Sequence, residues 1–340
     1  MTATTVTPVT LLTGFLGSGK TTLLNRLLAH PASGDCAVIV NEFGPVAIDH
    51  ALVRTASENI VLLPSGCVCC QVAGDLVQAM RDLYFKRAAG EIPAFRRAIV
   101  ETSGLADPAP IARTLIELPM VAARYALSGI VTTVDGVHGM DQLDRHPEAV
   151  KQAAVADRLV ITKADIAEPA ALGALEARLA ALNPGAPQLR SVLGDADPAR
   201  LLDTGLHRGG ERLADPDSWL RAGVYRRVGA PPAVAHDPRI TAFAWFADSP
   251  VDWAAFEDAL ATLLDLAGDR ILRLKGLVNA RGAPGPVAVH AVQHTLYPPA
   301  QLPGWPDADR RTRLVFIVRD LDESFVARTL ESFVTAPAER

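Results

Sequence analysis

Short apolar runs rich in β-branched residues alternate with longer amphipathic stretches over about the first 200 residues. The apolar runs predict strands at residues 9–13, 37–40, 98–100, 130–134 and 159–162. Between them, apolar residues recur at helical spacing at residues 21–29, 71–87, 108–117 and 169–182. Alternating strands and helices are typical of a doubly wound α/β domain, with helices on both faces of a mostly parallel sheet.

The pattern changes after residue 206. Residues 207–238 are rich in Gly, Pro, Asp and Arg and show little periodicity, which indicates a linker. Further along, the pattern predicts strands at 240–246, 271–278, 287–293 and 313–318 and helices at 253–266 and 324–334. We therefore predict an α/β domain at 1–206, a linker at 207–238 and a smaller α+β domain with an antiparallel sheet at 239–340.

Composition and charge indicate the location of the protein and exclude some classes of partner. The chain has 340 residues, of which 49% are hydrophobic and 21% charged, as in a globular protein. It contains no apolar run of the roughly 18 to 20 residues that a membrane span needs, and no secretory leader pattern opens it. A net charge of −5 with mixed signs gives no basic stripe. We expect a cytoplasmic protein that binds neither membrane nor nucleic acid.

The segment Gly14–Thr21 has the sequence GFLGSGKT and matches the phosphate-loop pattern G-x-x-x-x-G-K-[ST]. It lies between a predicted strand and a predicted helix, which is the context the motif requires, so we predict a P-loop NTPase fold. Lys20 is the expected catalytic contact to the β- and γ-phosphates, and Thr21 the expected Mg²⁺ ligand. The nucleotide-binding residues predicted here are Gly14, Gly17, Ser18, Gly19, Lys20, Thr21 and Thr22.

An acidic residue at the end of a second strand completes a P-loop magnesium site. Glu101 follows the apolar run 98–100 and begins the sequence Glu-Thr-Ser-Gly. We predict that Glu101 is catalytic and holds Mg²⁺, directly or through water, and that Gly104 brings a backbone N–H to the γ-phosphate. The alternative is a Glu that merely ends a strand.

A third segment, Thr162-Lys163-Ala-Asp165, follows the strand predicted at 159–162. A carboxylate there accepts hydrogen bonds from N1–H and the 2-amino group of guanine, whereas adenine presents an acceptor at N1. We predict that Thr162, Lys163 and Asp165 bind the base and that GTP is the substrate. A surface turn with the same residues is the alternative.

Three of the four cysteines lie within Gly66-Cys67-Val-Cys69-Cys70. Thiolates select Zn²⁺ and other borderline or soft ions, and three sulfurs leave one position open, which suits a site that must release its metal. Glu42 is a candidate fourth ligand or a group near Mg²⁺, and Asp49 is a weaker one. Buried structural cysteines and a redox pair are the alternatives.

Taken together, these segments resemble the CobW-type GTPases, a P-loop family related to HypB and UreG and associated with cobalt, zinc and other metal delivery to enzymes. The resemblance rests on residues 14–21, 41–44, 66–70, 101–104 and 162–165. It implies a GTP-hydrolysing metallochaperone with Mg²⁺ as cofactor, Zn²⁺ or Co²⁺ as cargo and a client metalloprotein as partner. The C-terminal part is similar to the family's second domain.

Two features depart from that family. Its base-binding motif usually begins with Asn, where this chain has Thr162, so part of the hydrogen bonding is lost. Many relatives carry a histidine-rich stretch, whereas the eight histidines here are dispersed, which argues against metal storage. His290 and His294 are more typical of solvated or core histidines than of metal ligands.

A GTP-gated regulator of a metalloenzyme, with only a structural metal of its own, is the second hypothesis. A structural zinc site usually has four protein ligands and no open position, so its ion should be released less readily than that of a carrier site. The sequence leaves the metal, the client and the oligomeric state open, a homodimer included.

Overall fold

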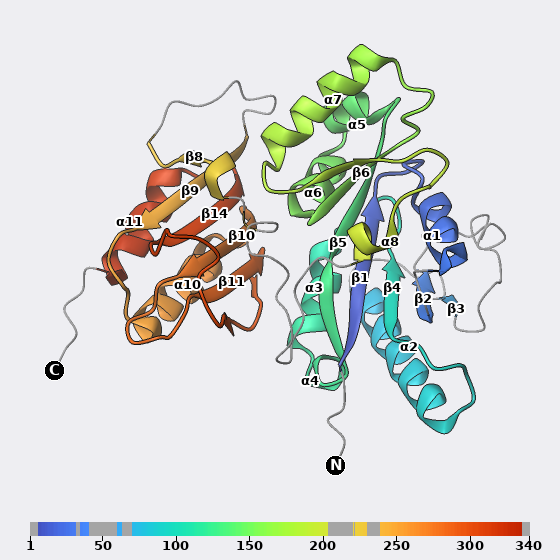
Figure 1. Cartoon of the computed structure of the whole chain (residues 1–340), viewed down its shortest axis with the longest axis horizontal. Coiled ribbons are helices and arrows are strands. Elements are labelled where there is room, and N and C mark those ends of the chain that lie inside the picture. Colours follow the sequence, from blue (N-terminus) through green and yellow to red (C-terminus); the bar gives the residue numbers. More distant parts are fainter. Residues whose placement is uncertain are drawn as a thin grey trace. The chain divides into compact units, whose positions relative to one another are not determined.

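The structure is a computed structural model that describes residues 6–31, 35–40, 60–62, 70–202, 220, 222–229 and 239–334 (Figure 1). The chain divides into two compact units. The first comprises Met1–Ala177 and Ala186–Ala214, and the second Arg178–Gly185 and Asp215–Arg340. Most of the predicted linker lies outside the described residues, so the proposed domain limits stay predictions.

Seven strands of the first unit form one parallel sheet in the order β3-β2-β4-β1-β5-β6-β7. The doubly wound α/β fold is thereby confirmed, with a sheet that is parallel throughout rather than mostly so. The strands are β1 (Thr7–Gly14), β2 (Cys36–Val40), β3 (Ile60–Leu62), β4 (Arg97–Glu101), β5 (Tyr125–Asp135), β6 (Arg158–Thr162) and β7 (Gln188–Arg190).

Eight helices are described wholly or, for α7, partly in this unit. Four of them were predicted from apolar spacing: α1 (Lys20–Ala29), α2 (Cys70–Ala89), α3 (Pro108–Glu117) and α7 (Pro169–Leu182). The other four are too short for a clear periodicity: α4 (Pro119–Ala122), α5 (Gly139–Arg145), α6 (Pro147–Val155) and α8 (Pro198–Leu202). A proline opens α3, α4, α6, α7 and α8, as expected at a first helical position.

Helices cover both faces of this sheet. Leu23 of α1 and Leu201 of α8 share a buried cluster with Val131 of β5. The next strand residue, Thr132, points to the opposite face, where its hydroxyl donates to the backbone carbonyl of Gln152 in α6 (2.9 Å). Burial on both faces explains why the strands are continuous apolar runs rather than alternating ones.

The carboxyl ends of parallel strands meet at one edge of the sheet, and in doubly wound folds ligands bind there, where the strand order reverses. Strand β1 lies between β4 and β5, and its connection through α1 leads past β4 to β2 (Figure 1). The last residues of β1, β4, β5 and β6 are Gly14, Glu101, Asp135 and Thr162. The fold thus brings these four positions to the same edge.

The second unit contains a mixed sheet in the order β12-β11-β10-β14-β9-β8, with β13 paired to β11. All pairs are antiparallel except β8 with β9, so the antiparallel sheet that we predicted has one parallel edge strand. Its strands are β8 (Arg226–Arg227), β9 (Ile240–Ala247), β10 (Ile271–Val278), β11 (Val287–Val292), β12 (Thr295–Leu296), β13 (Ala300–Gln301) and β14 (Thr312–Arg319).

Two helices, α10 (Trp253–Ala267) and α11 (Glu323–Val334), cover one face of this sheet, and the 3-10 turn η3 (Ala222–Val224) precedes β8 (Figure 1). Their apolar side chains pack with alternate strand residues such as Phe243 and Phe316, which are fully buried. Asp252 caps α10 by accepting from the backbone N–H of Ala255 (3.1 Å). Each unit therefore has a hydrophobic core of its own.

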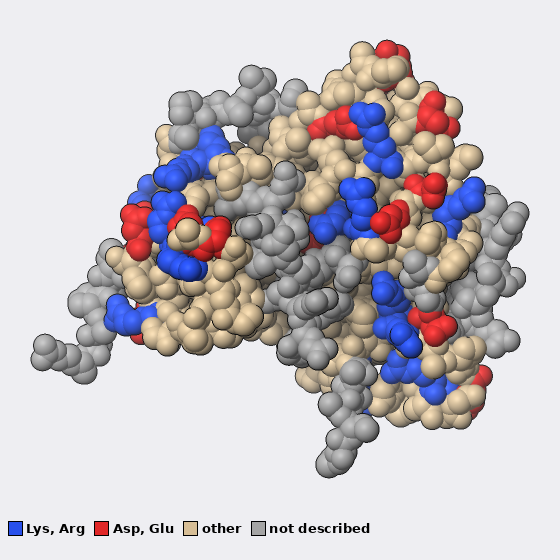
Figure 2. Space-filling view, in the orientation of Figure 1, with Lys and Arg blue, Asp and Glu red and all other residues tan. Residues whose placement is uncertain are grey.

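No helix among the described residues is long and apolar enough to span a membrane. On the face shown in Figure 2, Lys and Arg lie interspersed with Asp and Glu on both units.

Candidate nucleotide-binding site

Glycine conformation shapes the phosphate loop. Gly14, Gly17 and Gly19 all have positive φ (144°, 72° and 86°), where side chains are strained. A Cβ on Gly14 would also lie 2.2 Å from the hydroxyl oxygen of Thr133. That hydroxyl is hydrogen-bonded to the Ser18 hydroxyl (2.7 Å), which joins the loop to β5. At Gly14 the loop therefore lies too close to the sheet edge for a side chain.

Lys20 begins α1, and only 8% of its surface is exposed. Its Nζ donates to the carbonyl oxygens of Gly14 (2.9 Å) and Phe15 (3.2 Å), so the ammonium group lies inside the curve of the loop. The first turn of α1 contains no acidic residue. A buried cation and the positive end of a helix dipole thus face the same space, an arrangement that favours phosphate.

Thr21 and Glu101 meet although they are 80 residues apart in sequence. The Thr21 hydroxyl donates to Glu101 Oε1 (2.8 Å), and Glu101 is 1% exposed at the end of β4. The next residue, Thr102, is tied to β1 by its N–H to the Leu12 carbonyl and its hydroxyl to Thr13 Oγ1, both 2.9 Å. A hydroxyl and a carboxylate held together supply the hard oxygen ligands that Mg²⁺ prefers, so the donor set fits magnesium.

Gly104 lies directly against the phosphate loop. A Cβ at this position would be 2.6 Å from Leu16 Cδ2 and 2.7 Å from the Leu16 backbone nitrogen. A turn follows, in which the Ala106 N–H donates to the Ser103 carbonyl (3.1 Å). Only a residue without a side chain permits this approach, which gives a steric reason for Gly104.

The Thr162 hydroxyl donates to the Ser18 carbonyl (2.8 Å) and the Val134 carbonyl (3.2 Å). The side chain that replaces the more usual Asn therefore still joins the base-binding segment to the phosphate loop. Asp165, three residues later, is exposed at the same edge. Thr162 thus contacts the phosphate loop, whereas Asp165 presents an exposed carboxylate acceptor.

Lys163 adopts a left-handed conformation (φ 55°), and its Nζ is 2.7 Å from Asp135 Oδ2. The other carboxylate oxygen accepts from the backbone N–H of Val137 (2.8 Å) and His138 (3.1 Å). Burial by itself would raise the pKa of Asp135, but the bond from Lys163 and these two backbone bonds outweigh burial and lower that pKa. Asp135 was not among the predicted residues, although its place at a strand end is a sequence signal for it.

A second unpredicted contact comes from the loop after β7. Arg26 Nε in α1 donates to the Leu193 carbonyl (3.1 Å), and a Cβ on Gly194 would lie 2.6 Å from the Thr22 carbonyl. Leu193 has φ 50° and is 66% exposed. The loop borders the base-binding side of the site, since the Ala164 N–H is 3.5 Å from the Ser191 carbonyl. No sequence motif signals it.

The family model for the CobW/HypB/UreG nucleotide-binding domain matches residues 8–190, which is more than half of the chain. The chain belongs to the CobW/HypB/UreG family. A second model, the cobalamin synthesis protein cobW C-terminal domain, matches residues 240–334. The resemblance stated from the motifs is thereby confirmed.

Family members of similar length align along almost the whole chain. The zinc chaperone YjiA of Escherichia coli K12 is 33% identical over 315 residues, covering 93% of this chain and 95% of YjiA. The zinc chaperone CobW of Pseudomonas aeruginosa is 29% identical over 362 residues, covering 96% and 91%. A crystal structure of Zn(II)-bound YjiA GTPase from E. coli superposes with a TM-score of 0.70 at 27% identity, covering 96% of this chain and 99% of that one.

Most of the predicted cargo site lies outside the described residues: Glu42, Asp49, Cys67 and Cys69 are not described, and of Cys70 only the backbone is, as the first residue of α2. Cys36 differs from them. It is buried in β2, and desolvation raises the pKa of its thiol to about 12 in spite of the nearby Arg97 charge. Within the described ranges, no three His, Cys, Asp or Glu side chains are grouped to hold a metal.

The two histidines of the family's second domain occupy different surroundings. His290 is 3% exposed and stacks on Tyr297, with ring centroids 4.1 Å apart. His294 is partly exposed, and its Nε2 is 3.0 Å from Asp269 Oδ1. These positions agree with the core and solvated histidines that the sequence favoured.

Proposed function

We propose that this protein is a GTPase that uses nucleotide binding and hydrolysis to carry a transition metal to a client protein. Its substrates are GTP and the metal ion, and Mg²⁺ is its cofactor. The relatives named above, two zinc chaperones and a zinc-bound GTPase, support this function.

The register of three neighbouring parallel strands carries the proposal. Val40, the last residue of β2, pairs with Leu62 at the end of β3 on one side and with Glu101 at the end of β4 on the other. Two residues after Val40 comes Glu42, and five residues after Leu62 comes Cys67. The segments that contain the predicted cargo ligands therefore follow two strand ends that lie level with Glu101, the proposed magnesium ligand.

The residues of the phosphate loop would bind and hydrolyse GTP as follows. Lys20 exchanges its bonds to loop carbonyls for bonds to phosphate oxygens, where its charge stabilises the transferred phosphoryl group. Thr21 and Glu101 would hold Mg²⁺, which would supply positive charge to the β- and γ-phosphates. A water oxygen would then bond to the γ-phosphorus while the bond to the β,γ-bridging oxygen breaks and a water proton passes to a phosphate oxygen, which leaves GDP and phosphate. Gly104 donates its N–H to the γ-phosphate, so loss of that group releases the segment.

Asp165 would select guanine, since its exposed carboxylate accepts from N1–H and the 2-amino group. Thr162 keeps the base-binding segment attached to the phosphate loop, and Lys163 is oriented by Asp135. This explains how the segment works without Asn.

The cargo would bind to Cys67, Cys69 and Cys70, with Glu42 as the fourth ligand. Three thiolates and one carboxylate suit Zn²⁺ first and Co²⁺ second. Free thiolates require a reducing compartment, so we place the protein in the cytoplasm. A client metalloprotein receives the ion after hydrolysis loosens the ligand set.

Zinc stoichiometry and GTP turnover of cysteine variants test this function. The double variant Cys67→Ser/Cys69→Ser should lose one zinc per chain, as measured with a chromophoric chelator, and should lose any zinc dependence of GTP turnover. Cys36→Ser is the matched control, because its buried protonated thiol is no ligand, and it should keep both.

Competition with a graded chelator separates carriage from a structural metal. A carried ion should become more labile when a non-hydrolysable GTP analogue is replaced by GDP. Equal zinc affinity in both nucleotide states would instead favour the regulator with a structural metal, and unchanged zinc binding in the double variant would contradict the cargo site.

A further inference from the structure

Helix α6 contacts the segment that follows Glu101 through a buried amide. Gln152 is 1% exposed, and its Nε2 donates to the carbonyls of Gly104 (3.2 Å) and Ala106 (3.0 Å). Two carbonyl oxygens require a donor, so the nitrogen of the amide must face them. One side chain of α6 therefore holds two backbone groups of a turn that touches the phosphate loop.

The neighbouring residue strengthens the same connection. Lys151 forms an ion pair with Asp107, whose other carboxylate oxygen caps α3 by accepting from the Ala109 N–H (3.0 Å). Consecutive residues of α6 thus hold both ends of the stretch from Gly104 to Asp107. Because these contacts hold one short stretch of chain from the same helix, a shift of that stretch would break them together.

Helix α6 is itself fixed to the phosphate loop and the sheet. His146 is the residue directly before α6, and its ring stacks on that of Phe15 with centroids 4.5 Å apart. The Thr132 hydroxyl of β5 donates to the Gln152 backbone carbonyl (2.9 Å). The helix therefore joins the phosphate loop and the sheet to the turn after Glu101.

The oxygen of the same amide faces the other way. Gln152 Oε1 is buried and has no hydrogen-bond partner among the described residues. Gln152 also lines a small pocket of about 10 Å³, together with Phe15, Thr133, Gly139 and Gln142, among others. Such a pocket has room for about one water molecule. Among the described residues, the hydrogen bonds of this amide are therefore those that its nitrogen donates.

We propose that Gln152 is a positioning residue that sets the Gly104 turn for contact with the γ-phosphate. This inference rests on the proposed function, in which Gly104 donates to that group. Holding the Gly104 carbonyl fixes the peptide plane beside the N–H that meets the phosphate. The amide therefore stabilises the state that binds GTP more than the state that binds GDP.

Gln152→Met tests the proposal, since it keeps the length of the side chain and removes the donor. Affinity for the β,γ-imido analogue of GTP with Mg²⁺ should fall about 10-fold, while affinity for GDP stays within about twofold, and kcat should fall more than KM changes. The measurement is isothermal titration of both nucleotides against the full-length chain.

Gln188→Met is the matched control. This residue of β7 also donates from its amide nitrogen to a backbone carbonyl, that of Glu176 (3.0 Å), and its Oε1 likewise has no partner in the described part of the chain. It lies at the amino end of its strand, away from the nucleotide edge. Its replacement should change thermal stability but leave the ratio of GTP to GDP affinity unchanged.

Gln152→Glu provides a second readout if the Met variant does not fold. Its carboxylate would face two carbonyls, so only the protonated form can donate a bond. The GTPase activity of this variant, divided by that of the unaltered protein at the same pH, should therefore rise as pH falls. Equal losses of GTP and GDP affinity, or no pH effect, would overturn the role of Gln152. A failure of the unaltered chain to bind GTP would instead overturn the proposed function.

Discussion

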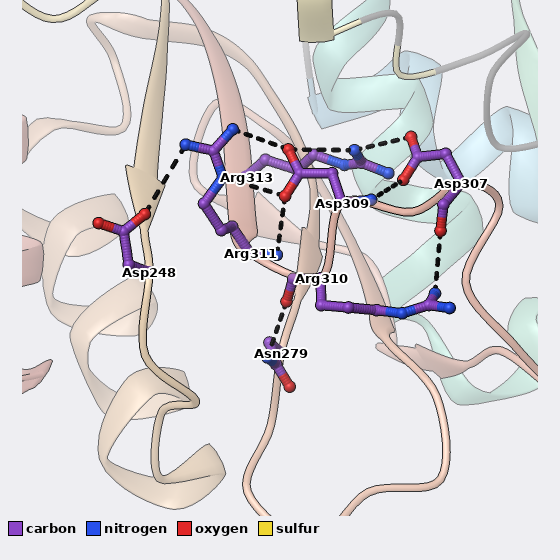
Figure 3. Close-up of polar contacts among 7 residues, drawn as sticks. All are labelled: Asp248, Asn279, Asp307, Asp309, Arg310, Arg311 and Arg313. Carbon is purple, nitrogen blue, oxygen red and sulfur yellow. Dashed lines mark hydrogen bonds and ion pairs between the residues drawn. The ribbon is translucent and has the colours of Figure 1, made fainter.

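The nucleotide edge of the first unit and the ion network of the second use charge in opposite ways. At the nucleotide edge, Lys20 and Glu101 are almost fully buried, and the bonds described above join them to loop carbonyls and one hydroxyl. In the second unit, Asp309 pairs with Arg311 (2.8 Å) and Arg313 with Asp307 (2.8 Å) (Figure 3). In the function proposed above, the first arrangement binds GTP and Mg²⁺, whereas the second pairs oppositely charged side chains with one another.

A perturbed pKa does not distinguish these regions. The hydrogen bond from Arg311 lowers the pKa of Asp309 to about 2, although Asp309 faces no predicted ligand. Perturbed groups gather at functional sites, but structural ion networks perturb them too. Glycines that exclude side chains, and a cation held by carbonyls at a helix N-terminus, are the better signs of a site.

Lys20→Met should have the largest effect on catalysis. The variant keeps the aliphatic stem and loses the charge, so kcat/KM for GTP should fall by about 100-fold or more. Thermal unfolding should change little, because the hydrogen bond between the Ser18 and Thr133 hydroxyls still joins the loop to β5. Lys86→Met, on the exposed side of α2, is the control and should turn over GTP normally. Equal activity of the two variants would remove Lys20 from the mechanism.

Thr21→Val should have the second largest effect on catalysis, a loss of about 10-fold to 100-fold in kcat at limiting Mg²⁺. Valine has nearly the same shape but cannot donate to Glu101 or bind a metal through oxygen. The activation curve for Mg²⁺ should shift to higher concentration, and Thr21→Ser should restore it. A Val variant with an unshifted curve would show that the hydroxyl has only a structural role.

Asp165→Asn should alter nucleotide choice rather than catalysis. The amide loses an acceptor for the guanine N–H groups, so GTP affinity should fall by about 10-fold to 100-fold, while XTP, which has a carbonyl at position 2, should gain. Competition binding with GTP, XTP and ATP measures the change. Glu168→Gln removes a nearby exposed carboxylate and should leave the preference intact. If both variants behaved alike, Asp165 would not contact the base.

Local patterns predicted the parts of the site that depend on backbone shape. Gly14, Gly17 and Gly19 are needed for their positive φ, and the phosphate-loop motif marks them in the sequence. Glu101 was predicted because it is an acidic residue at the end of a predicted strand. Parallel strands supplied the rest of the geometry, because their carboxyl ends share one edge.

Contacts between distant side chains were not predictable in the same way. Gln152 contacts Gly104 across 48 residues and Arg26 contacts Leu193 across 167, and no periodicity or motif marks either pair. Helix α6 has nine residues, too few for its apolar spacing to stand out. The fold therefore follows largely from pattern, whereas the residues that position the site follow only from packing.

Asp309→Asn should have the smallest effect, on stability and not on GTP turnover. The folded pKa of about 2 lies below the unfolded value, so the carboxylate stabilises the fold above roughly pH 4, and this contribution is lost as pH falls toward 2. Since the group is partly solvated, the variant should lose only about 1 kcal/mol at neutral pH, and the difference should vanish in acid. Asp248→Asn, whose side chain is 88% exposed, should lose less. Chemical denaturation between pH 2 and 7 measures both, and a constant difference across that range would mean that the pairing with Arg311 does not set the stability of this network.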